Sequence, residues 1–187
     1  MNKAGLRREL AKRRGAIPGR SLLDARIAEH ILSLPAYRAA KTVMAYAAIR
    51  SEPSLFAIFE ACFKAGKRLV LPALRGGRME ALEHAPDSAL AEGAFHVPEP
   101  RGRVIPPGEI DLILCPGLGF GRDGARLGYG RGCYDRFLSE TRALRAGVCY
   151  GACLLGAGEI PVEEWDRPMD FLVTEDGASP RAERKRL

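Results

Sequence analysis

The segment at residues 115–138, CPGLGFGRDGARLGYGRGCYDRFL, connects a predicted strand to a predicted helix. The apolar run that leads into it, residues 110–115, is typical of a buried strand, and Tyr134, Phe137 and Leu138 repeat at helical spacing. The segment contains seven glycines and four arginines. The sequence therefore predicts a strand, a glycine-arginine loop and a helix, in that order.

Such a loop is suited to bind an anion. Glycine allows close approach of the backbone and positive φ angles, so that successive N–H groups converge on phosphate oxygens. Arginine adds a planar, permanently charged group that binds two such oxygens at once. The N-terminus of the following helix also favours negative charge. The alternative is a long surface turn whose arginines are only solvated, but the composition favours a phosphate site.

Two familiar nucleotide-binding loops fit this segment less well. Gly119, Gly121 and Gly124 form a literal G-x-G-x-x-G after the predicted strand. A dinucleotide-binding loop runs straight into a helix, however, whereas further glycines keep this chain irregular as far as Gly132. The sequence also lacks the G-x-x-x-x-G-K-[ST] pattern of a P-loop. We expect neither of these two loops.

The rest of the chain alternates between helical and strand-like spacing. Helices are predicted at residues 3–14, 21–32, 53–67 and 135–140, and strands at 41–49, 68–74, 79–84, 110–115, 145–154 and 169–175. Pro35 is expected to end the second helix and Pro72 the second strand, and 79–84 reads as an edge strand. The alternation predicts an α/β fold, a three-layer α/β/α domain with a mostly parallel sheet.

The composition fits one intracellular domain. The chain has 187 residues, 47% of them hydrophobic, which predicts a single domain over residues 1–187 with a basic, disordered tail from about residue 178. No apolar run approaches the roughly 20 residues that span a bilayer, and no secretory signal follows the basic N-terminus. We therefore expect a cytoplasmic protein without membrane association.

The cysteines and the net charge leave two weaker alternatives open. The five cysteines are an odd number without C-x-x-C spacing and read as reduced core thiols, although Cys149 and Cys153 with a histidine form a weak metal-cluster candidate. The formal charge of +6 admits a basic RNA-binding module. An aromatic content of 7% gives little sign of a stacking platform. We expect polyanionic small molecules as ligands, no nucleic acid, and a monomer.

Residues 124–136, GARLGYGRGCYDR, closely resemble the signature of the 5-formyltetrahydrofolate cyclo-ligase family, approximately G-x-R-L-G-x-G-x-G-Y-Y-D. Cys133 stands where the first tyrosine of that pattern is usual. Residues 3–7, KAGLR, are similar to the family's N-terminal K-x-x-L-R, and residues 95–100 to its g-x-x-E-P element. The resemblance extends to about Glu175, through a P-x-x-x-x-D element and a D-x-x-[IV]-T-E strand.

The resemblance implies an enzyme that closes 5-formyltetrahydrofolate to 5,10-methenyltetrahydrofolate, with Mg²⁺ as cofactor and ATP as co-substrate, and releases ADP and phosphate. The formyl oxygen would attack the γ-phosphate to give a phosphorylated imidate, N10 would add to the activated carbon, and phosphate would leave. Phosphoryl transfer of this kind requires positioning and charge stabilisation more than covalent chemistry by the protein. A fold of this family recruited to another nucleotide-linked reaction is the alternative.

The resemblance also implies roles for individual residues. Arg126, Arg131 and Lys3 are expected to act in catalysis by holding the triphosphate. The nucleotide site is expected to include Lys3, Ala4, Gly5, Leu6, Arg7, Arg126, Leu127, Gly128, Tyr129, Gly130, Arg131, Gly132, Cys133 and Tyr134. The folate site is expected to include Arg7, Ala47, Glu52, Met79, Tyr129 and Tyr134, and the magnesium ligands are Asp135 and Asp166.

Several of these residues also have simpler interpretations. Glu52 is placed to stabilise the first turn of a helix, while Met79 and Tyr134 fit a packed core equally well. The basic residues of the first helix other than Lys3 and Arg7 are expected to form a solvated face.

Two further residues are candidates for chemical roles. Cys133 precedes a helix, where a thiol pKa falls, but no histidine is near it in sequence, and we do not expect a nucleophile. His96 is the one histidine considered as an acid-base group.

Overall fold

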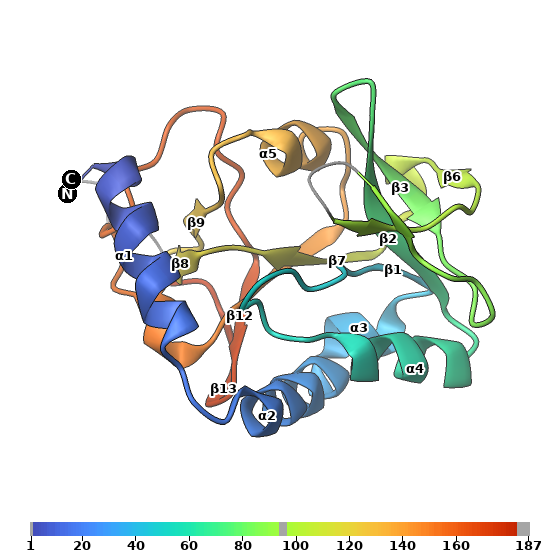
Figure 1. The fold of residues 1–187 in the computed structure, drawn as a ribbon, viewed down its shortest axis with the longest axis horizontal. Coiled ribbons are helices and arrows are strands. Elements are labelled where there is room, and N and C mark those ends of the chain that lie inside the picture. The colour runs from blue at the N-terminus through green and yellow to red at the C-terminus, as the bar shows by residue number, and fades with distance from the viewer. Residues whose placement is uncertain (1, 94–96, 183–187) are drawn as a thin grey trace.

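The protein is described by a computed structural model that covers residues 2–93 and 97–182. Its centre is an eight-stranded sheet in the order β13-β12-β10-β7-β1-β2-β3-β6 (Figure 1). The five parallel strands are β1 (Thr42–Met44), β2 (Arg68–Arg75), β7 (Leu112–Pro116), β10 (Leu144–Val148) and β12 (Phe171–Thr174). The antiparallel strands at the two edges are β3 (Arg78–Glu83), β6 (Val104–Ile105) and β13 (Gly177–Pro180).

Helices cover both faces of this sheet, so the predicted three-layer α/β/α architecture is confirmed. In Figure 1, α2 (Arg20–Ser33), α3 (Pro35–Ala39) and α4 (Phe56–Lys64) lie below the sheet, and α5 (Cys133–Leu138) lies above it. The helix α1 (Lys3–Gly15) packs on the same core cluster as α5, through Leu6 and Leu10. None of the helices within the described residues is long and apolar enough to cross a membrane.

Burial explains why the local patterns predicted most of these elements. In β7, residues Leu112, Ile113, Leu114 and Cys115 are all fully buried, as expected for a parallel strand covered on both faces. The Asn2 side chain caps α1 by accepting a hydrogen bond of 2.9 Å from the Gly5 N–H. The sheet therefore holds its central strands rigidly, with their carboxyl ends at one edge.

Tertiary pairing changes several of the predicted boundaries. The strand predicted at 41–49 stops at Met44, and the extended chain beyond it leads to Glu52. The strand β2 does not end at Pro72 but continues to Arg75, because Pro72 lies beyond the last pairing with β1 and pairs only with β3. The segment 79–84 is not an edge strand, since β6 pairs with the outer side of β3.

Two other predictions are corrected near prolines and glycines. Pro35 does more than end α2: it occupies the first turn of α3, where its missing N–H costs nothing. The segment 145–154 is a strand only as far as Val148, after which come a 3-10 turn, Gly151–Cys153, and the short β11 (Leu154–Leu155).

Residues 178–180 are not part of a disordered tail, contrary to the prediction. Gly177–Pro180 forms β13, which pairs antiparallel with β12, so the last predicted strand is not the last observed one. Residues 183–187 lie outside the described residues, as does His96.

The glycine-arginine segment contains structure that the sequence did not predict. After β7 the chain forms a small antiparallel pair, β8 (Gly119–Gly121) and β9 (Arg126–Leu127), and β11 pairs parallel with β8. The loop proper is thus residues 128–132, which run from β9 into α5. The described residues also contain three minor elements: β4 (Ala91–Glu92), β5 (Pro98–Glu99) and the 3-10 turn Pro107–Glu109.

Candidate active site

A cavity of about 1240 Å³ opens beyond the carboxyl ends of the parallel strands. Seven segments of the described chain line it: the start of α1, residues 46–50 and 52, residues 72–74 of β2 with Met79 of β3, residues 97–99, Pro116 at the end of β7, residues 126–135, and residues 163, 165 and 166. Ligands of open α/β sheets bind at this edge. The volume is sufficient for more than one small molecule, since ordinary ligand pockets hold roughly 300–1,000 Å³.

Two glycines give the loop its shape over this cavity. Gly130 has φ of 95°, and a Cβ there would lie 3.2 Å from the guanidinium carbon of Arg7. Gly132 has φ of 65° and directly precedes α5. Both backbones are in a region that other residues seldom adopt. Gly130 therefore allows the loop to pass close to the Arg7 side chain, and Gly132 allows the turn into α5.

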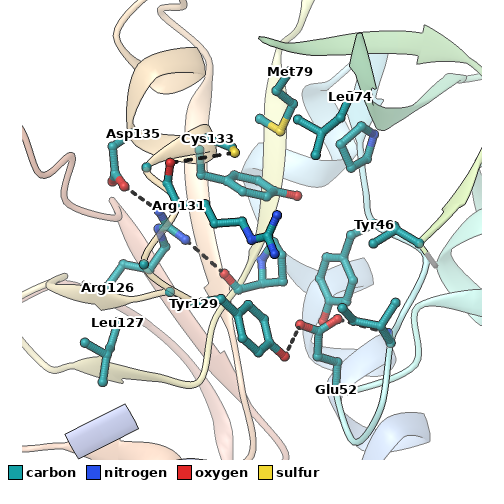
Figure 2. Close-up of a pocket in the computed structure, with 18 of the residues that line it drawn as sticks. Tyr46, Glu52, Leu74, Met79, Arg126, Leu127, Tyr129, Arg131, Cys133 and Asp135 are labelled. Atoms are coloured by element: carbon teal, nitrogen blue, oxygen red, sulfur yellow. Dashed lines mark hydrogen bonds and ion pairs between the residues drawn. The ribbon is translucent and has the colours of Figure 1, made fainter. Parts of the chain in front are cut away.

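The basic residues of the loop and of α1 converge on one side of the cavity. The Arg7 Nε–H donates to the Gly128 carbonyl at 2.9 Å. The Arg126 Nη2 group pairs with Asp135 Oδ2 at 2.9 Å, as Figure 2 shows. Lys3 Nζ lies 2.7 Å from Asp166 Oδ2 and 3.3 Å from Glu163 Oε2.

Ion pairing keeps the Lys3 ammonium charged. Burial lowers the pKa of Lys3, but hydrogen bonds and charge from Asp166 and Glu163 outweigh it and raise the pKa above the ordinary value. Lys3 and Arg126 are thus each held in place by a carboxylate, whereas Arg7 is held by a backbone carbonyl.

Two buried polar atoms at this wall have no hydrogen-bond partner among the described residues. They are the Arg126 Nε and the Tyr134 hydroxyl. The Arg126 guanidinium lies 5.1 Å from the centre of the Tyr134 ring. Leaving a buried donor unsatisfied costs about 1–3 kcal/mol. Both residues line the cavity, so a polar ligand bound there is one source of the missing partner.

The opposite side of the cavity carries a buried carboxylate, Glu52, which is 7% exposed. Its Oε1 accepts from the Tyr129 hydroxyl at 3.0 Å (Figure 2). Its Oε2 accepts from the Ile49 N–H at 3.0 Å. Burial raises the pKa of Glu52, although the Ile49 N–H, the Arg14 charge and Tyr129 act against it. Burial and the charge of Glu52 also raise the pKa of Tyr129.

Arg14 lies buried next to this carboxylate. The prediction that Arg14 belongs to a solvated basic face was wrong. Arg14 is 1% exposed. It donates to the Tyr129 hydroxyl at 2.7 Å and to the Gly117 carbonyl at 2.9 Å, and it lies 3.9 Å from Glu52. The sequence did carry a signal, because Leu6, Leu10 and Arg14 follow at intervals of four and share one helix face.

An apolar wall completes the cavity beside Glu52. Tyr46, Leu74 and Met79 lie on this side, as Figure 2 shows. Met79 and Tyr134 both line the cavity and pack against the core, so the packing interpretation is confirmed for each, while contact with a folate stays a prediction. The sequence pointed to Glu99 only as part of the wall. Its Oε1 accepts from the Leu74 N–H at 2.9 Å, and its Oε2 pairs with Arg75 at 2.7 Å.

Most residues predicted for the site line this one cavity. The exceptions are Gly5 and Leu6, which do not line it: Leu6 is buried in the core. The helical period explains the difference, since Lys3 and Arg7 are one turn apart on the same face. Those that line it are Lys3, Ala4, Arg7, Ala47, Glu52, Met79, Arg126, Leu127, Gly128, Tyr129, Gly130, Arg131, Gly132, Cys133, Tyr134, Asp135 and Asp166.

The carboxylates of the site suit a metal ion that is coordinated partly by the protein and partly by a bound small molecule. Within the described residues no three or more His, Cys, Asp or Glu side chains gather to hold a metal ion. This argues against the alternative cluster at Cys149 and Cys153, both of which are buried. Asp135 and Asp166 each line the cavity beside a cation. Magnesium takes few protein carboxylates and completes its shell with phosphate oxygens and water, so these two residues fit that ion.

Known proteins resemble this chain over most of its length. The model of the 5-formyltetrahydrofolate cyclo-ligase family matches residues 1–175. The 5-formyltetrahydrofolate cyclo-ligase of Escherichia coli (strain K12) is 30% identical over 154 residues, which cover 79% of this chain and 85% of that protein. The enzyme of the same name from Mus musculus is 26% identical over 192 residues, 93% of this chain and 94% of that protein.

A solved structure is similar as well. The NMR structure of 5,10-methenyltetrahydrofolate synthetase from Aquifex aeolicus superimposes with a TM-score of 0.86 at 32% identity, and covers 100% of this chain and 96% of that one. The similarity therefore includes both the sheet and the segments that line the cavity.

Proposed function

Because the chain belongs to the 5-formyltetrahydrofolate cyclo-ligase family, we propose that its cavity closes 5-formyltetrahydrofolate to 5,10-methenyltetrahydrofolate and consumes ATP in the presence of Mg²⁺. One observation supports this proposal most directly. A wall of cations and a wall with a buried carboxylate and apolar side chains face the same cavity. The first suits a triphosphate, and the second suits a flat heterocycle with hydrogen-bond donors.

The cationic wall would hold the triphosphate. Lys3, Arg7, Arg126 and Arg131 line it, and the loop backbone at Gly128, Gly130 and Gly132 adds N–H donors. The unpaired Arg126 Nε has a donor to give to a phosphate oxygen. Asp135 and Asp166 would hold Mg²⁺, which supplies charge neutralisation for the phosphates when it is bound.

The other wall would orient the folate. Glu52 uses one hydrogen bond on each oxygen within the protein, and an ionised carboxylate has about four acceptor sites. The remaining sites suit the amine and amide N–H groups of a pterin. Ala47, Met79, Tyr129 and Tyr134 would then contact the ring system.

The proposed reaction needs no nucleophile from the protein. The formyl oxygen forms a bond to the γ-phosphorus while the bond to the ADP oxygen breaks, which gives a phosphorylated imidate. N10 then adds to the formyl carbon, N10 loses its proton, and the C–O bond breaks to release phosphate. Positively charged side chains at the triphosphate stabilise the charge of the transferred group, which is where such enzymes gain most of their rate.

The test is the absorbance band of methenyltetrahydrofolate after protein, 5-formyltetrahydrofolate, ATP and Mg²⁺ are mixed, with each component omitted in turn. We expect an increase only in the complete mixture. A folded protein that binds ATP and gives no increase would refute the substrate and point to another nucleotide-linked reaction.

A further inference from the structure

Trp165 stands out among the exposed apolar side chains because it lines the cavity. It is the single tryptophan of the chain and is 64% exposed. A lone exposed apolar residue is ordinary on a protein surface. Phe56, for example, is 65% exposed and does not line the cavity. The position of Trp165 at the rim of a binding cavity, and not its exposure, therefore calls for an explanation.

The neighbours of Trp165 fix it beside the cationic wall. The next residue, Asp166, accepts a hydrogen bond of 2.7 Å from Lys3 Nζ, and Glu163 lies 3.3 Å from the same nitrogen. The backbone around it is also tied, since the Glu163 N–H donates to Asp166 Oδ2 at 2.9 Å. Trp165 thus sits on a segment that the first turn of α1 holds in place.

The segment 163–166 and the strands of the apolar wall belong to different parts of the fold. Figure 1 shows the connection between β11 and β12, in orange-red, arching from beside the first turns of α1 toward α5, while β2 and β3 lie on the other side of α5. Met79 and Leu74, which belong to those strands, form the wall next to Glu52. Trp165 lines the same cavity as Lys3, Arg7 and Arg126, and its chain neighbour Asp166 pairs with Lys3, so the indole lies on the cationic side of the cavity.

We propose that Trp165 stacks on the base of the bound ATP. The inference rests on the proposed function, because it takes the cationic wall as the triphosphate site. In a nucleoside triphosphate the base lies one ribose beyond the phosphates, which matches an aromatic ring just outside a cluster of cations. Indole offers a large flat face for stacking, and stacking on a base is independent of the pattern of hydrogen-bond donors.

Stacking also explains why the Trp165 side chain is exposed at this position. Nothing in the described protein packs against most of the Trp165 surface, so its replacement removes little that stabilises the fold. A bound base would cover that surface. We therefore expect Trp165→Ala to weaken ATP binding about tenfold, the size of one lost base-aromatic stack, and to leave 5-formyltetrahydrofolate binding unchanged.

The single tryptophan makes this measurable in the unmodified protein. Excitation of the indole reports on Trp165 alone. Titration with ATP and Mg²⁺ is expected to quench or shift the emission, whereas inorganic tripolyphosphate, which carries the charges without the base, is expected to bind and change the emission far less. Calorimetry in parallel determines whether each ligand binds.

Matched variants separate stacking from structure. Trp165→Phe keeps an aromatic face and is expected to recover most of the ATP affinity that Trp165→Ala loses. Phe56→Ala removes an equally exposed aromatic ring outside the cavity and serves as the control, with parental affinity for both ligands.

The outcomes are distinct. Equal emission changes with ATP and tripolyphosphate, a response to 5-formyltetrahydrofolate instead of ATP, or parental ATP affinity in Trp165→Ala would each overturn the inference while the proposed function stands. A protein that does not bind ATP by calorimetry would overturn both.

Discussion

Arg14→Met is the substitution whose effect the structure defines most fully. Methionine has a long, flexible side chain that fills much of the same space, so the change removes mainly the charge and its hydrogen bonds. The side chains of Arg14 and Glu52 are 2% and 3% exposed. The variant thus leaves Glu52 without its buried cation, and it leaves the Gly117 carbonyl and the Tyr129 hydroxyl without their donor.

The expected cost follows from that burial. Removing one partner of a buried ion pair destabilises a protein by about 3–5 kcal/mol, because the other charge stays buried and uncompensated. Arg13→Met is the control, since Arg13 is 41% exposed and pairs with Glu9 one turn away. An exposed pair of this kind contributes only about 0.3–0.5 kcal/mol.

The pH dependence has a definite sign. The pKa of Glu52 in the folded protein is raised above its ordinary value of 4.5. Its contribution to folding stability is therefore fully present below that value and is lost as the pH rises through the folded-state pKa. The Arg14 charge lowers this pKa, so its removal raises the pKa further and increases the loss. The stability deficit of Arg14→Met should be larger near pH 7.5 than near pH 5, roughly the lower end of the titration.

Urea unfolding followed by circular dichroism is the suitable assay. Tryptophan fluorescence would report unfolding poorly, because the single tryptophan is already 64% exposed in the folded state. A deficit for Arg14→Met no larger than that for Arg13→Met, or one that grows toward low pH, would refute the reasoning. Michaelis constants for the folate should rise in the same variant, because Arg14 orients Glu52 and Tyr129.

Two further predictions concern residues on either side of the loop. Arg126→Ala and Asp135→Ala should each lower turnover by roughly a hundredfold while the circular dichroism spectrum stays unchanged. Arg122→Ala, which changes an exposed residue, is the control. Turnover near the parental level in either variant would show that the substituted residue has no role in the reaction. Cys133 should be the one thiol that reacts rapidly with an aromatic disulfide in the native protein, and bound ATP should slow that reaction; a second fast thiol that persists in Cys133→Ser would contradict this. The other thiols are buried, and burial raises the pKa of Cys62, Cys115, Cys149 and Cys153, that of Cys115 to about 12.

Local patterns in the sequence predicted the sheet and helix layers because each element carries its own periodicity. The four consecutive residues of β7 that become buried form an apolar run in the sequence. The interval of four residues between Leu6, Leu10 and Arg14 in α1 can be read from the sequence as well. The glycine-arginine segment was also predictable from the sequence, because its composition alone indicates an anion-binding site. A short strand such as β13, which has little apolar character, gives no such signal, and its position follows from pairing with β12.

The sequence by itself therefore determined the α/β class, the glycine-arginine loop and the resemblance that led to the family. Tertiary structure alone decided what meets at the cavity. It buried Arg14 next to Glu52, paired β6 with the outer side of β3, and placed Asp166, the chain neighbour of Trp165, beside Lys3, 163 residues away in the chain. The physical reason is that a local pattern fixes which face of an element is buried. Which distant element buries that face depends on packing across the whole sheet, and no single segment encodes that.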